Sequence, residues 1–328
     1  MKAVLLDGFG GPEVMRIGTA PAPRPAPGQV LIDVAATSVN RPDVLQRQGN
    51  YPPPRGESEI LGLEAAGTIA ELGSGVQGLV AGQRVAALLA GGGYAEIAAA
   101  HAGHVLPIPD SMTFEEAACI CETYITAYLN VFVGAALKDG ETVLLHGGGG
   151  GVTTAALQLC KALAPASQVI VTASTGKVAR VAELGADYVI DYRSEDFAEA
   201  ALRITAGRGA DVILDHIGAA YLERNTRTLG VGGRLALIGV MGGRKAEIDL
   251  GRVLVKRQRI IGSVLRPRPV AEKSEIIADF RRRVMPLFAA RRLVPVIDRV
   301  YPLAEVAAAH RRMEEGAHFG KIVLQCRT

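Results

Sequence analysis

The sequence predicts an α/β protein in which one domain holds a parallel sheet and a second domain is mostly β. Apolar runs of strand length recur, with helix-length segments between them, from residue 142 to residue 265. The first 120 residues instead hold short strands interrupted by glycine and proline. The chain of 328 residues has room for two domains, since one domain commonly takes about 100–200 residues.

Six apolar runs predict the strands of the parallel sheet. They start 19–26 residues apart, which is typical of strand–helix units joined by short loops. Such a sheet is covered by helices on both faces, and six strands complete a doubly wound dinucleotide-binding fold. The runs are TVLLH, QVIVTA, DYVID, DVILDH, RLALIG and IIGSVL, starting at residues 142, 168, 187, 211, 234 and 260.

The N-terminal segment predicts a β-rich domain. VLIDVAATSV at 30–39, AAGTIAELG at 65–73 and QRVAALLA at 83–90 have strand length. The proline-rich segments 21–28 and 51–56 are typical of loops. The segments between these runs show little helical periodicity, so we expect a compact β structure here.

The segment after residue 265 predicts an amphipathic helix, a strand, a second helix and the final strand GKIVLQC. A separate domain of about 60 residues would bury little core. We therefore expect these last elements to return to the N-terminal domain. The expected boundaries are residues 1–122 with 266–328 for the β-rich domain, and 123–265 for the parallel-sheet domain.

Composition excludes several classes of protein. Lys plus Arg is 36 and Asp plus Glu is 33, a net charge of +3 that does not indicate nucleic-acid binding. The basic stretch 252–292 is typical of a solvated helix face. No apolar run reaches the roughly 18 residues that span a bilayer, and the N-terminus lacks the apolar core of a secretory signal. Four scattered cysteines favour free thiols, so we expect a cytoplasmic protein.

The stretch LLHGGGGGVTTAALQLCK at 144–161 predicts a nucleotide site. Five glycines follow an apolar strand and lead into an apolar helix, which is the context a dinucleotide loop requires. A flexible linker would rarely occupy such a position. We expect the backbone amides of Gly149, Gly150, Gly151 and Val152 to face a pyrophosphate at the helix N-terminus.

Thr153 departs from the pattern of a dinucleotide loop. A small residue normally allows the helix to pack closely on the first strand, and overpacking costs about 1–3 kcal/mol where a site cannot adjust. The phosphate-facing amides do not depend on this residue being glycine. The helix could tilt slightly, or Thr154 and Ala155 could supply the close contact, so we expect a working loop with one weakened detail.

The second strand points to NADPH as the dinucleotide. An acidic residue about 20 residues beyond the glycines would bind the ribose hydroxyls of NAD, yet residues 168–182 contain no Asp or Glu. Ser174 and Lys177 offer a hydroxyl and a cation that suit a 2′-phosphate. Tyr192, after the third strand, could close over the adenosine.

The motifs together resemble a zinc-independent quinone oxidoreductase of the medium-chain dehydrogenase/reductase superfamily. The resemblance covers nearly the whole chain. The chain most resembles the p53-inducible quinone oxidoreductase branch, a relative of ζ-crystallin. It implies a GroES-like catalytic domain beside a Rossmann domain, with NADPH in the cleft between them, and a homodimer built through edge strands such as IIGSVL. The motifs are GGPEV, NRPDVLQRQGNYPPP, ILGLEAAG, the glycine loop, AELGAD, ILDHIG, SVLRPR and GKIVL.

The resemblance also implies that no metal takes part. Zinc-dependent relatives carry Cys where this chain has Ser38–Val39–Asn40, and His where it has Leu63, next to Glu64. Without zinc the acceptor must already be electrophilic, as a quinone or an activated enone is. The oxyanion that forms then needs a hydrogen-bond donor.

The residues expected at the site follow from the same resemblance. Tyr51, on the proline-stiffened NYPPP loop, is the expected donor to the substrate, and Asn40 is expected near the nicotinamide. Either could instead be an ordinary packing or turn residue. Thr126 is expected to contact the nicotinamide or the pyrophosphate. Backbone contacts to the nicotinamide half are expected from Gly239, Met241, Leu265 and Arg266.

Two other functions remain open from the sequence. An NADPH-dependent enoyl or alkenal reductase would share the fold and the hydride step but must also protonate a carbon, which Tyr51 could do. A non-catalytic crystallin-like or RNA-binding protein is the more remote alternative. The sequence does not exclude the enoyl reductase, whereas the retained Ser174, Lys177, Tyr192 and Tyr51 argue against the non-catalytic protein.

Overall fold

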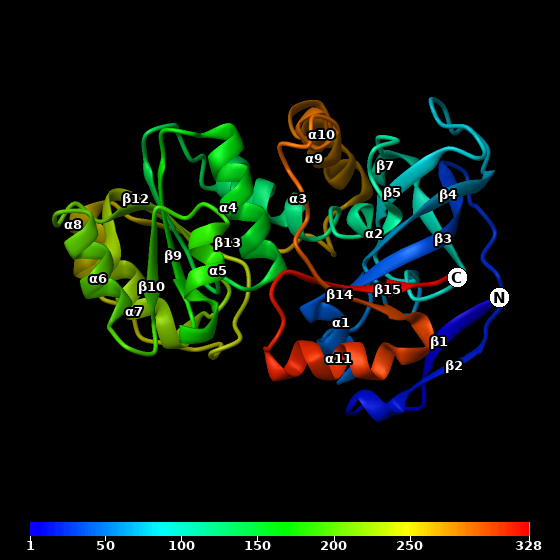
Figure 1. The fold of residues 1–328 in the computed structure, drawn as a ribbon, viewed down its shortest axis with the longest axis horizontal. Helices are drawn as coiled ribbons and strands as arrows, with labels where there is room; N and C mark the ends of the chain where they lie inside the picture. Colours follow the sequence, from blue (N-terminus) through cyan, green and yellow to red (C-terminus); the bar gives the residue numbers. More distant parts are fainter. Residues whose placement is uncertain (328) are drawn as a thin grey trace. The chain divides into compact units, whose positions relative to one another are not determined.

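The structure is a computed structural model that describes residues 1–327, and it forms two compact units. Residues 1–125 and 265–328 make up unit 1, and residues 126–264 make up unit 2 (Figure 1). The chain therefore leaves unit 1, folds unit 2 and comes back. Within the described residues, no helix is long and apolar enough to cross a membrane.

Unit 2 is built on a six-stranded sheet with the strand order β10-β9-β8-β11-β12-β13. Every pair of neighbours is parallel, and the order reverses at β8, which is the doubly wound topology. This confirms the predicted six-stranded parallel sheet. The strands are β8 Thr142–Leu145, β9 Gln168–Ala173, β10 Tyr188–Asp191, β11 Ala210–Asp215, β12 Leu229–Leu237 and β13 Arg259–Gly262.

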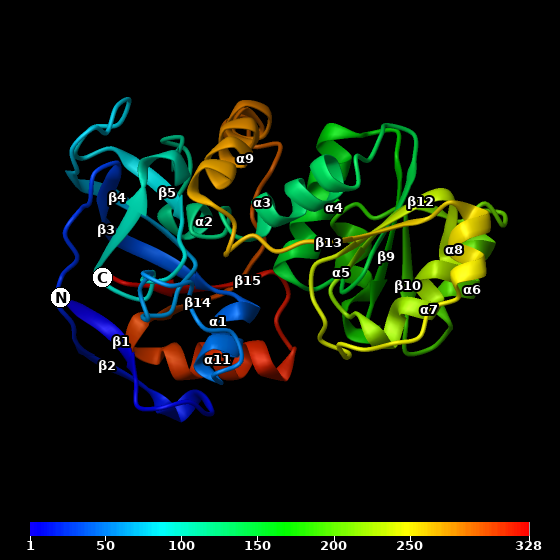
Figure 2. The ribbon, with the colours of Figure 1, turned by 180° about the vertical axis from the view of Figure 1, so that it is seen from behind.

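Helices of unit 2 connect these strands, as a parallel sheet requires. The central strand β8 is buried along its whole length, so both of its faces are covered. Figure 2 shows the helices around the sheet from behind. They are the π-helical turn η3 Leu129–Gly134, α4 Gly151–Leu163, η4 Thr175–Lys177, α5 Val178–Glu183, α6 Phe197–Ile204, α7 Ala219–Thr228 and α8 Leu250–Lys256.

Unit 1 is built on a seven-stranded sheet with the order β14-β15-β3-β4-β5-β7, in which β6 also pairs with β3. The C-terminal strand β15 runs antiparallel to β3, so the end of the chain completes the sheet begun near its start. A separate hairpin joins β1 Lys2–Leu6 to β2 Met15–Thr19. The sheet strands are β3 Gln29–Val39, β4 Glu64–Leu72, β5 Arg84–Leu88, β6 Ile97–His101, β7 Val105–Pro107, β14 Ile297–Pro302 and β15 Lys321–Gln325.

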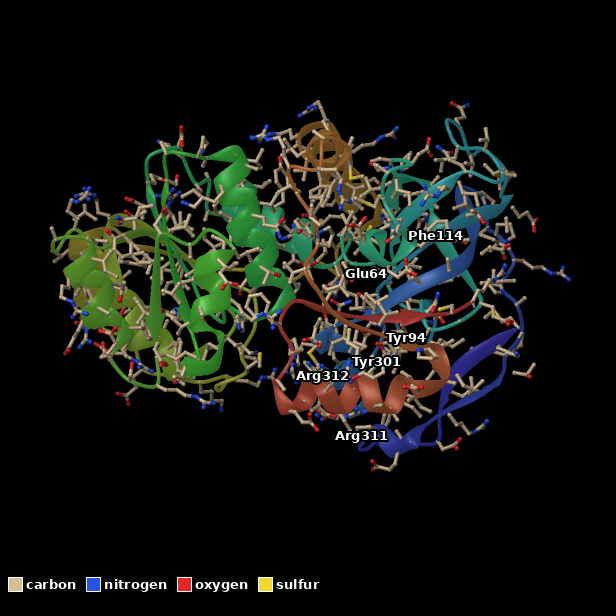
Figure 3. All side chains as sticks on the ribbon, viewed as in Figure 1. Glu64, Tyr94, Phe114, Tyr301, Arg311 and Arg312 are labelled. Atoms are coloured by element: carbon tan, nitrogen blue, oxygen red, sulfur yellow. The ribbon has the colours of Figure 1, made fainter. Side chains whose placement is uncertain are left out.

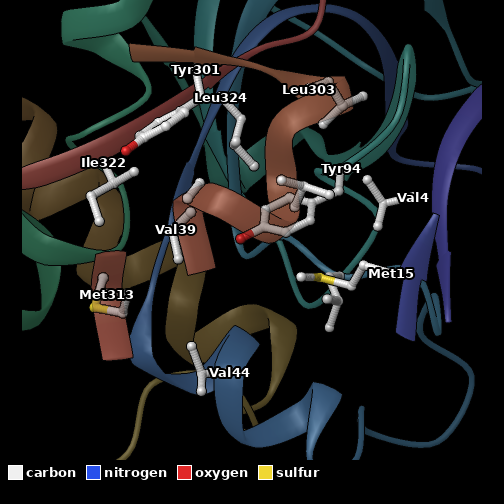
Figure 4. Close-up of a cluster of buried hydrophobic side chains, with 13 residues drawn as sticks. Val4, Met15, Val39, Val44, Tyr94, Tyr301, Leu303, Met313, Ile322 and Leu324 are labelled. Atoms are coloured by element: carbon white, nitrogen blue, oxygen red, sulfur yellow. The ribbon is translucent and has the colours of Figure 1, made fainter. Parts of the chain in front are cut away.

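Short helices flank the sheet of unit 1, and apolar side chains fill the space between them. One buried cluster joins Val4 of β1, Val44 of α1, Met313 of α11 and Ile322 of β15 (Figure 4). This cluster fixes α1 and α11 to the sheet. The helices are η1 Pro12–Val14, α1 Arg41–Arg47, η2 Ala102–His104, α2 Phe114–Ala117, α3 Thr123–Tyr128, α9 Val270–Arg283, α10 Met285–Ala289, η5 Leu303–Glu305 and α11 Val306–Glu315.

Candidate functional site

The glycine loop of unit 2 connects β8 directly to α4. Gly147 takes a positive φ of 72°, and the N–H of Gly150 donates to its carbonyl at 2.8 Å, which closes a tight turn. Gly150 is the N-cap of α4 and no side chain caps the helix. Because one predicted amide, that of Gly150, already closes the turn, the amides of Gly149, Gly151 and Val152 are the better candidates to meet an anion.

Neighbouring side chains lie close to the first three glycines of this loop. A Cβ on Gly147 would lie 2.5 Å from the ring of His216, and a Cβ on Gly149 would lie 2.4 Å from Cδ of Lys177. A Cβ on Gly148 would come within 2.9 Å of Val171. The loop is therefore a backbone surface with a lysine beside it, which fits the diphosphate of a nicotinamide dinucleotide.

Thr153 is accommodated rather than strained. It is buried in the first turn of α4, and its hydroxyl donates to the carbonyl of His146 at 2.6 Å. That carbonyl lies just beyond the end of β8. Where a dinucleotide loop usually has a small residue, this chain uses a hydrogen bond to tie the helix to the strand.

Three residues predicted to select NADPH lie at the carboxyl ends of β9 and β10. Ser174 directly follows β9, and the N–H of Lys177 donates to its carbonyl at 2.8 Å. The N–H of Tyr192, just beyond β10, donates to Ala173 at 3.2 Å. Lys177 lies against Gly149, and the backbones of Ser174 and Tyr192 follow the carboxyl ends of the neighbouring strands β9 and β10.

Gly239 and Met241 follow β12 and lie against the end of β11. The N–H of Met241 donates to the carbonyl of His216 at 3.1 Å, and a Cβ on Gly239 would approach the same carbonyl to 3.0 Å. Met241 is exposed. Because His216 also touches Gly147, these residues share the carboxyl edge of the sheet with the loop, where open α/β sheets bind ligands.

Thr126 carries a buried polar atom that the protein leaves unpaired. Its Oγ1 has no hydrogen-bond partner among the residues that the structure describes, whereas its carbonyl accepts from Asn130 at 2.8 Å. Buried hydroxyls are normally bonded, so an unpaired one at a predicted contact suits a ligand atom.

In unit 1, Asn40 belongs to a buried polar cluster around Glu64, the residue labelled in Figure 3. The amide Nδ2 of Asn40 donates to Glu64 Oε1 at 2.9 Å, and its Oδ1 accepts from Lys321 Nζ at 2.5 Å. Asn40 is also the N-cap of α1, in a capping box with Asp43. Both ends of its amide are thus bonded inside the protein, so Asn40 can position its neighbours more readily than it can bind a substrate.

The same cluster does not fit a zinc ion. Lys321 Nζ lies 3.1 Å from Glu64 Oε1 and 3.2 Å from the carbonyl of Val39, and Ser38 donates to the same carboxylate at 2.6 Å. A buried ammonium would repel a cation, and serine and asparagine replace the thiolate and imidazole ligands that zinc prefers. Among residues 1–327, no group of three or more His, Cys, Asp or Glu could hold a metal ion.

Tyr51 lies beside Arg266, although the sequence placed the two residues in different roles. The Arg266 guanidinium lies over the Tyr51 ring, 5.3 Å from its centroid, and bonds Ala90 O and Gln46 Oε1, each at 2.7 Å. Burial raises the pKa of Tyr51, as does the charge of Glu122, while Arg266 lowers it. Arg266 and the buried Leu265 belong to unit 1. The Arg266 guanidinium contacts the ring and the carbonyl of Tyr51.

Sequence reasoning missed the roles of Lys321, Glu122 and His216. Lys321 and Glu64 are 257 residues apart, and only the pairing of β15 with β3 brings them together. Glu122 directly precedes α3, and the sequence shows no partner for it. His216 follows the fourth strand of the parallel sheet, and its place beside the glycine loop could have been expected from that position alone.

Two protein-family profiles match this chain, one in its N-terminal part and one in its C-terminal part. A profile described as an alcohol dehydrogenase GroES-like domain matches residues 26–110. A profile described as a zinc-binding dehydrogenase matches residues 184–324. The first lies in unit 1, and the second covers much of unit 2 together with the C-terminal part of unit 1.

Relatives and solved structures match over nearly the whole chain. The rat synaptic vesicle membrane protein VAT-1 homolog is 30% identical over 99% of this chain and 84% of its own length. The quinone oxidoreductase of Lama guanicoe is 33% identical, over 99% of this chain and 97% of its own. The structure of the Escherichia coli quinone oxidoreductase complexed with NADPH is 28% identical and covers 99% of this chain and all of that one, with a TM-score of 0.88. The CurK enoyl reductase is 27% identical over 99% of this chain and 98% of its own, with a TM-score of 0.87.

The fold, the glycine loop and these matches define a two-domain oxidoreductase of the nicotinamide-dependent kind. The α/β class, with a GroES-like part and a Rossmann sheet, is confirmed. The chain belongs to the medium-chain dehydrogenase/reductase superfamily.

Proposed function

We propose that the protein is an NADPH-dependent quinone oxidoreductase that works without zinc. One observation carries the proposal: unit 2 has a dinucleotide loop, while in unit 1 the Lys321 ammonium is bonded to Val39, Asn40 and Glu64, beside the segment where zinc-dependent relatives are expected to carry a Cys ligand. With no metal to polarise an alcohol or simple carbonyl, the acceptor must be electrophilic already. The 33% identical quinone oxidoreductase supports a quinone.

In this proposal the residues of unit 2 bind and orient the dinucleotide, which supplies a hydride when bound. The amides of Gly149, Gly151 and Val152 hold the diphosphate, and Ser174 and Lys177 hold the 2′-phosphate. Tyr192 closes over the adenosine, while Thr126, Gly239 and Met241 line the nicotinamide half. Positioning of this kind can supply most of the rate enhancement where the acceptor is reactive.

The residues of unit 1 act on the acceptor. The hydroxyl of Tyr51 donates to the acceptor oxygen as negative charge develops there. Arg266 holds the ring and the backbone of Tyr51, and Asn40 fixes the start of α1 through Glu64 and Lys321. The protein's part in the reaction is thus orientation plus one hydrogen-bond donor.

An enoyl or alkenal reductase is the second candidate. The likeness to the CurK enoyl reductase favours it, at 27% identity and a TM-score of 0.87. The same Tyr51 would then protonate carbon rather than bind an oxygen. Comparing turnover on a quinone with turnover on an enone and an enoyl thioester decides between them.

Nucleotide selectivity tests the proposal first. Titration of the protein with NADPH and NADH should show tighter binding of NADPH, and Lys177→Met should weaken NADPH binding about tenfold or more while leaving NADH nearly unchanged, because it removes a charge-assisted hydrogen bond. Lys161→Met is the matched control, since Lys161 pairs with Asp187 at the other end of α4. Binding of neither nucleotide would overturn the proposal and turn attention to the non-catalytic alternatives, crystallin-like or RNA-binding.

A further inference from the structure

A single buried side chain of α1 holds the loop that carries Tyr51. The loop runs from residue 48 to residue 63, between α1 and β4. Near its far end, the carbonyl of Glu59 accepts from Gln46 Nε2 at 2.9 Å, while Gln46 Oε1 accepts from Arg266 Nη2 at 2.7 Å. Because one bond needs the amide nitrogen and the other the amide oxygen, the Gln46 amide has only one orientation. Arg266 is thereby anchored to the helix that precedes the loop.

Arg266 contacts the near end of the same loop through its guanidinium group. Nη1 donates to the carbonyl of Tyr51 at 3.4 Å, and the guanidinium carbon lies 5.3 Å from the centroid of the Tyr51 ring. Nε donates to the carbonyl of Ala90 at 2.7 Å. The guanidinium is planar and rigid, so bonds from its three nitrogens fix its plane. Its position over the Tyr51 ring is therefore determined by the protein.

The positive charge of Arg266 has no carboxylate among its hydrogen-bond partners in residues 1–327. Its three acceptors are two carbonyls and one amide oxygen, all of them neutral. The described chain has two other buried arginines, and each of these bonds a carboxylate. The pairs are Arg47 with Glu314, at 2.6 Å, and Arg234 with Glu141, at 2.7 Å. A buried charge without such a partner costs free energy, so its presence here indicates a role for the charge itself.

A cation over the Tyr51 ring changes the phenol in a defined direction. A positive charge near an ionisable hydroxyl favours the anion, so the hydroxyl becomes a stronger hydrogen-bond donor. Burial is the largest influence on the pKa of Tyr51 and raises it, and Glu122 raises it further, while Arg266 lowers it. Without the guanidinium the phenol would be a weaker donor still. The other titratable groups that act on Tyr51 or Arg266 are Asp43, Glu57, Glu122 and Lys273.

We propose that Arg266 is a positioning residue for Tyr51: anchored by Gln46, it fixes the ring and, through its positive charge, strengthens the hydrogen bond that the phenol donates to the acceptor. This inference rests on the proposed function, in which the acceptor oxygen gains negative charge as the hydride arrives. Negative charge that spreads to the phenol oxygen is then beside a fixed cation. A neutral clamp would hold the loop equally well but would not strengthen the donor.

Substitutions at the two anchoring residues separate the charge from the clamp. Arg266→Met removes both, whereas Arg266→Lys keeps the charge and loses the planar fork. Gln46→Glu keeps an acceptor for the guanidinium but gives the charge a carboxylate partner. Gln46→Met removes the anchor and leaves the charge without a carboxylate, so it controls for the bond to Glu59 that Gln46→Glu also loses.

Titration of the Tyr51 phenol in the protein without cofactor gives the first measurement. Labelling with 3-fluorotyrosine makes the phenols more acidic, and fluorine NMR follows each of them; the Tyr51 signal is the one absent from Tyr51→Phe. The midpoint of this signal should rise by about one pH unit or more in Arg266→Met, and it should rise more in Gln46→Glu than in Gln46→Met. Arg299→Met is the matched control, because Arg299 lies over the ring of Tyr301, 5.7 Å from its centroid, and should leave the Tyr51 midpoint unchanged.

Turnover with a quinone gives the second measurement. Arg266→Met should lower kcat about tenfold or more and leave the KM for NADPH within about twofold, because the cation acts on the acceptor side of the reaction. Arg266→Lys should restore part of the lost rate, which a role for packing alone would not predict. In the Tyr51→Phe background, Arg266→Met should cost little more, since its effect passes through the phenol.

The outcomes separate the inference from the function on which it rests. An unchanged Tyr51 midpoint in Arg266→Met, or an equal loss of kcat with and without the Tyr51 hydroxyl, would overturn the role of Arg266 alone. A wild-type protein that binds NADPH but reduces no acceptor would overturn the proposed function, whatever the phenol titration gives. If Arg266→Met does not fold, Gln46→Glu decides by the same two measurements, since it retains the arginine: a wild-type midpoint and kcat would contradict the inference.

Discussion

The hydroxyl of Thr153 fastens the N-terminal turn of α4 to the end of β8. Its bond to the carbonyl of His146, at 2.6 Å, lies directly beneath the glycine loop. The threonine therefore contributes stability at a place where the loop itself must stay free of side chains. Its role is structural, and cofactor affinity should not depend on it.

We expect Thr153→Val to lower the free energy of unfolding by about 1–3 kcal/mol, because the buried His146 carbonyl loses its donor. Thr154→Val should cost less, since Thr154 bonds the Gly151 carbonyl within its own turn at 3.0 Å. Urea denaturation of both variants checks this, and NADPH titration should give wild-type affinity. A larger decrease in the free energy of unfolding in Thr154→Val than in Thr153→Val would contradict the structural role of Thr153.

At the scale of elements, one buried guanidinium joins α1, α11 and the loop before η1. Arg47 is fully buried, and it donates to Gly10 O at 3.1 Å, to His310 Nδ1 at 3.2 Å and to Glu314 Oε1 at 2.6 Å. Gly10 lies 300 or more residues before His310 and Glu314 in sequence. Arg47 thus determines how the ends of the chain are assembled around unit 1.

Arg47→Met should destabilise the protein by about 3 kcal/mol, at the lower end of the range for breaking a buried pair, because Glu314 is partly exposed. Arg16→Met is the control: its bond to Asp7 is exposed on both sides and should be worth less than about 1 kcal/mol. Thermal unfolding of the two variants measures the difference. Equal shifts in the melting temperature of the two variants would show that the buried hydrogen bonds of Arg47 add no stability.

Elements that follow from local patterns could be predicted from the sequence, whereas contacts across the chain could not. The six strands of unit 2 are continuous apolar runs, and the glycine loop is recognisable because its strand and helix are its neighbours in sequence. The pairing of Lys321 with Glu64 depends on how β15 pairs with β3, and no local signal encodes that. For the same reason the sequence predicts only a backbone contact of Arg266 to the cofactor, from its place after the sixth strand, and no local signal shows that its side chain lies over Tyr51.

At the scale of the whole molecule, unit 2 ends in an edge strand with an apolar helix beside it. β13 pairs on one side only, with β12, and Ile260 on it is 40% exposed. In α8, Leu250, Leu254 and Val255 are 70%, 76% and 72% exposed. An open strand edge next to exposed leucines is a surface that stable proteins cover, and we propose that a second copy of the chain covers it.

Light scattering with size-exclusion chromatography should therefore give twice the chain mass for the wild type. Leu254→Glu should convert the protein to a monomer, because a carboxylate cannot be buried unpaired at the interface. Val80→Glu changes another exposed apolar residue, which belongs to unit 1, and should leave the dimer intact. A wild-type monomer at micromolar concentration would contradict the proposal.

The bond from Arg47 to His310 has a consequence for how protons exchange in unit 1. A guanidinium can only donate, so His310 Nδ1 accepts and the neutral ring carries its proton on Nε2. That proton is donated to Tyr94 Oη at 3.1 Å, and the Tyr94 hydroxyl is left to bond Asp43. This series of hydrogen bonds runs in one direction and begins at the Arg47 guanidinium, which never releases a proton. It therefore cannot carry protons to Asp43. The imidazole N–H of His310 should consequently be among the last side-chain protons replaced when the protein is placed in heavy water.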